Sequence, residues 1–164
     1  MIETPSVDWL ALSPALALLA ASGIALLAAV LVPPWTRHAV SATVAFGGFV
    51  AAAICAVVVY EDTPEAVFVL EESLARDRLA ALAQVFLAIA GAAVVLVSWS
   101  EKRRDDHGEY YSLLTAAGAG MVFFVGAENL MTLFLGLEWF SLCLYILVAF
   151  DSERATSLEA GLKY

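Results

Sequence analysis

The sequence contains few of the residues that build redox, metal or nucleic-acid sites. Its two cysteines, Cys55 and Cys143, lie in separate apolar runs, and no CxxC or Cys/His spacing is present that could organise zinc or an iron–sulfur cluster. A glycine-rich dinucleotide fingerprint is also missing. The chain has 8 Lys and Arg against 17 Asp and Glu, which argues against a nucleic-acid partner. We expect both thiols to be buried and inert, and His38 and His107 to be solvated.

Long hydrophobic runs are what the sequence has instead. It is 62% hydrophobic and 15% charged, whereas soluble domains are roughly 45–50% apolar and about 25% charged. A membrane-spanning helix needs about 20 mostly apolar residues, and five runs approach or exceed that length, at residues 10–32, 39–60, 79–99, 110–127 and 130–150. The fourth run is shorter and rich in small residues, which would let a neighbouring helix approach closely. The sequence therefore predicts an all-α, polytopic transmembrane helix bundle of about five spans.

The charges between the runs predict the direction in which the chain crosses the membrane. Basic residues follow the first, third and fifth runs, namely Arg37, Lys102, Arg103, Arg104, Arg154 and Lys163. The opposite side has only Arg76 and Arg78. The positive-inside rule then places the N-terminus on the non-cytoplasmic side and residues 61–78 in an outward-facing loop, which could hold a strand or a short helix. Residues 1–9 have no Lys or Arg, unlike a cleaved signal peptide, so we expect the first run to be retained.

The last residues predict a turn and the start of a sixth helix. Asn129 precedes the fifth run and is expected to cap it, and Thr156 or Ser157 is available to cap a helix within residues 151–164. A helix of one or two turns cannot bury its apolar face. We therefore expect residues 1–164 to be a single membrane domain and the N-terminal part of a longer protein.

Glu138 is the residue that needs a functional explanation. It lies eight residues into the fifth run, which at about 1.5 Å per residue is about 12 Å from the helix start and close to the bilayer midplane. An acidic residue at that depth costs about 2.5–3.5 kcal/mol to insert and is too short to reach water by snorkelling. Ser141, Tyr145 and Phe134 share its helix face by their spacing. Residues of this kind usually mark ion or proton routes.

The chemistry of such a carboxylate suits a proton relay. A low dielectric raises its pKa and a nearby cation lowers it, so movement of the cation changes its affinity for a proton. The cation would have to come from another helix. The alternative is that Glu138 stays permanently paired or protonated and only fixes helix packing. Lys163 also has two readings, either a solvated cation spaced four residues after Glu159 or a functional cation that a longer helix carries toward the bundle.

Three stretches of the sequence resemble subunit N of bacterial respiratory complex I, a family of antiporter-like membrane subunits of the proton-pumping NADH:quinone oxidoreductase. They are GEYYSLL at residues 108–114, NLMTLFLGLEWFSLCLYILVAF at residues 129–150, and SLEAGLKY at residues 157–164. The first three runs match mainly in hydropathy and order. Trp139 and Cys143 stand where such proteins commonly have other apolar or small residues.

The resemblance implies a function and two site residues. Glu138 corresponds to the family's intramembrane glutamate on the fifth helix, which works with a lysine on a later broken helix, and Lys163 corresponds to a lysine at the start of the sixth helix that is implicated in transport. The implied activity is proton translocation across the bacterial plasma membrane, coupled to electron transfer from NADH to quinone. No cofactor is expected in this chain, because NADH, FMN, iron–sulfur clusters and quinone would belong to partner subunits. The implied partners are the other membrane and peripheral subunits and the lipid bilayer.

Two other readings stay open at this point. Subunits of multi-component cation/proton antiporters and of membrane-bound hydrogenase-type complexes share a glutamate on the fifth helix. A non-catalytic membrane scaffold, in which Glu138 only fixes packing, belongs to a different class. In every reading the chain itself carries out no redox chemistry, and it is part of an enzyme only as a subunit of a translocase.

Overall fold

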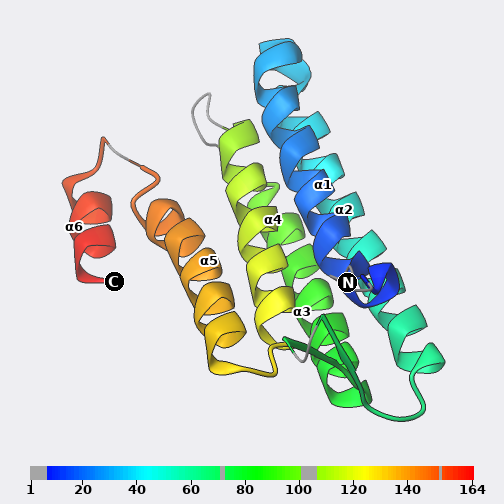
Figure 1. Cartoon of the computed structure of the whole chain (residues 1–164). Helices are drawn as coiled ribbons and strands as arrows, with labels where there is room; N and C mark the ends of the chain where they lie inside the picture. The colour runs from blue at the N-terminus through cyan, green and yellow to red at the C-terminus, as the bar shows by residue number, and fades with distance from the viewer. Residues whose placement is uncertain (1–6, 71–72, 101–106, 152) are drawn as a thin grey trace, which may run out of the picture.

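The structure, a computed structural model, describes residues 7–70, 73–100, 107–151 and 153–164. These residues form six helices and a two-stranded hairpin, in the order α1 (Trp9–Leu31), α2 (Pro34–Asp62), β1 (Val67–Val69), β2 (Leu74–Arg76), α3 (Arg78–Ser98), α4 (His107–Phe124), α5 (Leu130–Val148) and α6 (Ala155–Lys163). The first five helices alternate in direction, with α5 beside α4 and α6 beyond α5 (Figure 1). The predicted all-α bundle is confirmed.

Four of these helices are long and apolar enough to cross a membrane. They are α1, α2, α3 and α5. The fourth predicted run forms α4, which has 18 residues and begins with the polar sequence HGEYY, and it is not among the four. The predicted number of about five spans is therefore not confirmed. The second helix also begins earlier than residue 39, because Pro34 supplies a favourable first helical residue directly after the break that ends α1.

The first helix begins at a carboxylate cap and continues through an internal proline. Asp8 Oδ1 accepts hydrogen bonds from the backbone N–H groups of Leu10 (3.0 Å) and Ala11 (3.2 Å), two donors that a helix N-terminus leaves unpaired. Pro14 has no N–H to donate to the Leu10 carbonyl four residues earlier. The Ser13 hydroxyl donates to that carbonyl instead, at 2.7 Å. Asp8 and Ser13 thus stabilise a helix that its proline would otherwise weaken.

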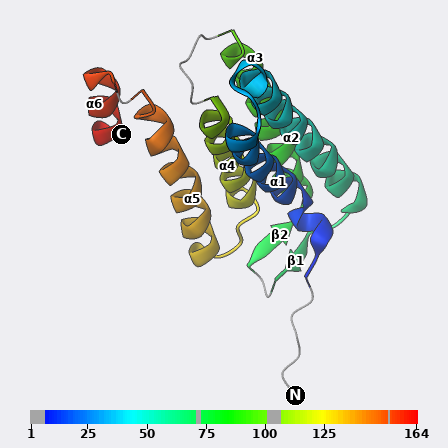
Figure 2. The same cartoon turned by 90° about the horizontal axis from the view of Figure 1, so that it is seen from above.

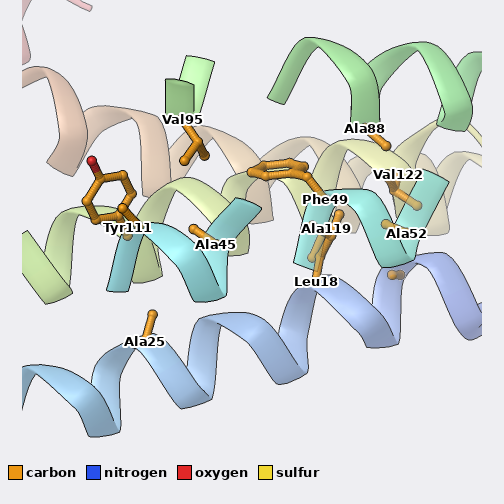
Figure 3. Packing of buried hydrophobic residues seen from close by; sticks show 12 residues of the cluster. Leu18, Ala25, Ala45, Phe49, Ala52, Ala88, Val95, Tyr111, Ala119 and Val122 are labelled. Atoms are coloured by element: carbon orange, nitrogen blue, oxygen red, sulfur yellow. The ribbon is translucent and has the colours of Figure 1, made fainter. Parts of the chain in front are cut away.

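The core of the bundle is built largely from alanine around a few large side chains. Helix α4 packs against α1, α2, α3 and α5. Figure 3 shows the centre of this core, with Leu18 from α1, Phe49 from α2, Val95 from α3 and Tyr111 from α4. A Cβ atom added at Gly118 would lie 2.7 Å from Cε1 of Phe49. The small residues of α4 therefore allow close approach, as their composition predicts.

A β-hairpin covers the end of the bundle where α1 begins (Figure 2). The two strands pair antiparallel, with Phe68 opposite Ala75. The second strand is also fixed to the turn between α4 and α5, because the N–H of Ala75 donates to the Gly126 carbonyl (2.8 Å) and the N–H of Glu128 donates to the Ser73 carbonyl (3.1 Å). The sequence left either a strand or a short helix possible for this loop, and the structure contains the two strands β1 and β2.

Three local predictions about polar and sulfur side chains are corrected. His38 is half-buried, not solvated, since its Nε2 lies 3.0 Å from the Trp99 carbonyl and its ring packs near Trp99. Cys55 and Cys143 are half-buried free thiols, not fully buried ones. The side chain of His107 is not described, and the triplet at residues 102–104 also lies outside the described residues.

The predicted cap of the last helix is wrong. Helix α6 starts at Ala155, one residue before Thr156, with Arg154 at the N-cap and no side-chain cap bond. The hydroxyl of Ser157 donates to the Val148 carbonyl at 2.8 Å, so this side chain ties α6 to the end of α5 and does not cap α6. The Val148 carbonyl is one of those that the C-terminus of α5 leaves without a helical partner, and it binds the hydroxyl that would otherwise be available for capping.

Candidate functional site

Helix α5 places the candidate site residue Glu138 at its centre. The helix has 19 residues and begins at Leu130, which makes Glu138 the ninth of them. Asn129 Oδ1 accepts a hydrogen bond from the N–H of Thr132 at 2.8 Å, so the predicted N-cap is confirmed. At about 1.5 Å per residue, the carboxylate lies about 12 Å from the helix start, far from either end.

One face of α5 is fixed against α4 by small residues. Thr132 and Gly136 are the buried residues of α5. A Cβ atom added at Gly136 would lie 2.9 Å from Cα of Phe124 on α4, and one added at Gly120 of α4 would lie 2.9 Å from the backbone nitrogen of Phe140. These contacts bring the two backbones close together and fix the rotation of α5 about its axis.

This rotation directs Glu138 away from α4. Residues 136 and 140 lie at the α4 contact, and at about 100° per residue position 138 falls on the opposite side of the helix. Glu138 is exposed in this chain, and Phe134 on the same face is 54% exposed. Within the described residues, Glu138 makes no hydrogen bond or ion pair. The cation that a relay needs is therefore not supplied by the part of the chain that the structure describes.

Lys163 does not pair with Glu138 either. Its ammonium group forms an ion pair with Glu159, four residues earlier on α6, and both side chains are exposed. Helix α6 packs against the end of α5, where the ring of Tyr164 lies 5.5 Å from that of Tyr145. The structure thus places Lys163 on the helix next to α5, near the end of α5 that is far from the hairpin, and leaves its transport role a prediction.

A second polar group lies at the hairpin end of the bundle, and the sequence analysis did not find it. Arg76 on β2 donates through Nε to the Thr63 hydroxyl (2.7 Å) and through Nη1 to Asp8 Oδ2 (3.0 Å), and it also pairs with Asp62. These bonds join the start of α1, the end of α2 and the hairpin. Arg78 adds a hydrogen bond from Nε to the Thr63 carbonyl at 3.1 Å.

The environment shifts the pKa of both partners of the central ion pair. Partial burial acts to raise the pKa of Asp8, but the N–H donors of Ala11 and Leu10 and the charge of Arg76 outweigh it, so the pKa is lowered. Burial acts to lower the pKa of Arg76, and its bonds to Asp62 and Asp8 outweigh that effect and raise it. Both groups are therefore held in their charged forms. In the sequence, the feature that could have indicated this charged cluster is that Arg76 and Arg78 are the only basic residues among several carboxylates.

The geometry contains no assembled metal centre in the described part of the chain. No group of three or more His, Cys, Asp or Glu residues there is placed to hold a metal ion. What the described residues offer chemically is a carboxylate at the centre of the apolar helix α5, on its open face, and a charged cluster at one end of the bundle. Together, the fold and Glu138 define a helical membrane protein with a carboxylate halfway along one of its apolar helices.

Comparison with known proteins identifies the family. The family model described as "NADH:quinone oxidoreductase/Mrp antiporter, TM" matches residues 127–164, which include Glu138 and Lys163. NADH-quinone oxidoreductase subunit N 1 of Koribacter versatilis is 35% identical over 92% of this chain and 32% of its own length. Subunit N of Salinispora arenicola is 32% identical over 99% of this chain and 36% of its own length. Subunit N 1 of Symbiobacterium thermophilum is 43% identical over 56% of this chain.

The chain belongs to the family of NADH-quinone oxidoreductase subunit N, the antiporter-like membrane subunits that its sequence resembles. It spans about a third of the length of the two relatives that match nearly all of it.

Proposed function

We propose that this chain contributes to proton translocation as part of a membrane subunit of an NADH:quinone oxidoreductase complex, with Glu138 as a proton relay. The observation that carries the proposal is the position of Glu138, at the centre of α5 and on the face that α4 leaves open. A carboxylate there costs about 2.5–3.5 kcal/mol to insert, and a structural role would be served by a residue turned toward α4. The names of the relatives, NADH-quinone oxidoreductase subunit N, support the assignment to such a complex.

The relay requires a cation that approaches the Glu138 carboxylate and withdraws from it, because a positive neighbour favours the ionised form of an acid and an apolar one favours the neutral form. When a cation from another helix approaches, the ionised form is favoured, and the proton is released. Lys163 is a further candidate site residue, because α6 lies next to α5, and we propose that it exchanges its exposed pairing with Glu159 for a role in this transport.

The coupling to redox chemistry is assigned to other chains. Subunits that bind NADH, FMN, iron–sulfur clusters and quinone would supply the free energy, and this chain would supply part of the proton route. Its partners in this proposal are the other membrane and peripheral subunits of the complex and the lipid bilayer. The chain is therefore enzymatic only as part of a translocase.

The orientation follows from the basic residues. We propose a bacterial plasma membrane protein with its N-terminus and hairpin on the non-cytoplasmic side, because the loops at the opposite end carry most of the Lys and Arg. Cysteines placed at the exposed residues Glu65 and Thr36 report on opposite ends of α2. On intact spheroplasts, an impermeant maleimide is expected to label Glu65→Cys and not Thr36→Cys; the reverse pattern would invert the topology.

Substitution of Glu138 in the assembled complex tests the relay. Glu138→Gln keeps the size and removes the titration, so we expect normal assembly and at least a several-fold loss of NADH-driven proton pumping in membrane vesicles. Glu138→Asp is expected to retain part of the activity. Glu128→Gln is the matched control, because Glu128 is exposed at the turn before α5. Normal pumping in Glu138→Gln would remove the relay, and loss of assembly in both Glu138 variants would favour the scaffold reading.

The description of the matching family model keeps a second candidate function in view, a subunit of a cation/proton antiporter. The two functions differ in their driving force. Vesicles with the wild-type protein would exchange sodium for protons without NADH if the chain served an antiporter, whereas the proposed function requires NADH oxidation.

A further inference from the structure

A water-sized cavity lies at the hairpin end of the bundle, on the other side of α4 from Glu138. It has a volume of about 20 Å³ and is partly open, and strand β2 of the hairpin is among its walls. Its walls come from α1, the end of α2, β2, the start of α3 and the end of α4, and its polar lining residues are Arg76, Asp77 and Gln84. About 10–15 Å³ is enough to hold one water molecule, provided that polar partners are present.

Gln84 is the buried polar residue that faces this cavity. It is 8% exposed, and its Nε2 donates to the Val122 carbonyl of α4 at 3.2 Å. That bond fixes the orientation of the amide, because the opposite orientation would bring two carbonyl oxygens together. The oxygen Oε1 is buried and has no hydrogen-bond partner within the described residues. A buried acceptor left unpaired costs about 1–3 kcal/mol.

We propose that this cavity is a hydrated recess in which an ordered water molecule donates a hydrogen bond to Gln84 Oε1, and that the recess is reached by water from the hairpin end. The proposal joins two independent observations, an acceptor with no partner and a space of the right size next to it. It goes beyond proton translocation, because it concerns a water site on residues to which the proposed function gives no role.

The other polar side chains of the lining, Arg76 and Asp77, already make hydrogen bonds. Arg76 donates to Thr63, Asp8 and Asp62, and Asp77 Oδ1 accepts from the N–H of Ala80 as the cap of α3. A metal cation would need six or more oxygen ligands if it were calcium or magnesium, and the cavity does not offer that number. A single water can donate to the buried acceptor Gln84 Oε1, which has no partner among the described residues, in a small and otherwise largely apolar space.

The recess would bring water to a depth comparable to that of Glu138. Gln84 is six residues into α3, or about 9 Å from its start, and both α3 and α5 begin at the hairpin end. Phe123 of α4 lines the cavity, and its ring centre lies 5.9 Å from that of Trp139, the residue after Glu138. The thickness of α4 therefore separates the proposed water from the α5 carboxylate.

Silver-ion accessibility of engineered cysteines tests the recess. In the assembled complex in detergent, with Cys55 and Cys143 replaced by serine, Gln84→Cys places a thiol at the cavity. Ala88→Cys is the matched control, because Ala88 lies one turn further along the same face of α3, is 1% exposed and does not line the cavity. Thiolates bind soft cations of this kind. We expect silver to consume the thiol at position 84 at least tenfold faster than the thiol at position 88; equal rates, or a slower reaction at position 84, would overturn the proposal.

A density map of the assembled complex provides a second, independent measurement. At a resolution that shows other buried waters, we expect a peak about 2.7–3.2 Å from Gln84 Oε1, and its loss in Gln84→Leu, which keeps the bulk and removes the acceptor. An empty cavity in the wild type, or a protein group bonded to Oε1, would contradict the proposal. Neither measurement depends on proton pumping, so the recess and the relay can fail separately.

Discussion

Arg76 shows that counting charges in the sequence does not predict which partners each charged side chain binds. In the sequence, it belongs to the sparse basic residues of one side and serves as a marker of topology. In the structure, it binds Asp8, Asp62 and Thr63, which come from segments up to 68 residues apart. Loop partners at such separations follow from the packing of the helices, which composition does not determine. The depth of Glu138, in contrast, depends only on helix register and was predictable.

Asp8 provides a test of the charged cluster through its pH dependence. Its pKa in the folded protein is below the ordinary value of 3.8, so the ion pair contributes stability that is fully present above pH 3.8 and is lost as the pH falls through the folded pKa. Asp8→Asn keeps the cap oxygen and removes the charge. We expect it to lower the free energy of unfolding by about 0.5–1 kcal/mol at pH 7, and the difference from wild type to vanish below the folded pKa.

Thermal unfolding in detergent at a series of pH values measures this effect. Asp62→Asn is the matched control, because Asp62 pairs with the same guanidinium but its side chain is 64% exposed, against 26% for Asp8. We expect it to cost less than Asp8→Asn. A difference between wild type and Asp8→Asn that grew as the pH fell would contradict the assignment.

Helix α5 shows which properties of an element the sequence determines. Its existence, its Asn129 cap and the central place of Glu138 all follow from local sequence. Its rotation does not, because it depends on which residues of α4 meet it. Gly120 and Gly136 allow the two backbones to approach, and only the paired structure shows that they lie at the same contact. The face on which Glu138 lies was therefore not predictable in advance.

Adding one methyl group at this contact tests the role of α4 in orienting α5. In Gly136→Ala, the new Cβ would lie 2.9 Å from Cα of Phe124, and backbone atoms cannot move aside as a flexible side chain can. We expect a loss of about 1–3 kcal/mol in the free energy of unfolding. A lower pumping activity is also expected, because α5 would turn or shift.

Gly47→Ala is the control for the glycine substitution. Nothing lies within 4 Å of a Cβ atom added at Gly47, so the higher helix propensity of alanine is expected to leave stability unchanged or to raise it by up to about 1 kcal/mol. Unfolding measurements on the two variants compare the same chemical change at a tight and at an open site. Equal effects would show that the α4–α5 contact does not fix α5.

The whole molecule is a bundle in which α5 is the least buried of the four helices long and apolar enough to cross a membrane. In their most apolar stretches, 39% of residues are buried in α1 and α2, compared with 11% in α5. The sequence predicted the helical membrane class from composition alone, since hydrophobic length is a local property. It did not predict α4 as the central helix, because α4 is the one of the first five helices that is not among those long and apolar enough to cross a membrane. Its role depends instead on small residues that accept four neighbours.

The proposed function requires Glu138 to gain and lose a proton during turnover. Infrared difference spectroscopy on the assembled complex measures this directly, because a protonated carboxyl group has a carbonyl band that an ionised one lacks. During NADH oxidation, we expect a carboxyl band that appears and disappears in the wild type and is absent from Glu138→Gln, while Glu128→Gln keeps it. A spectrum that is the same in wild type and Glu138→Gln would contradict the relay.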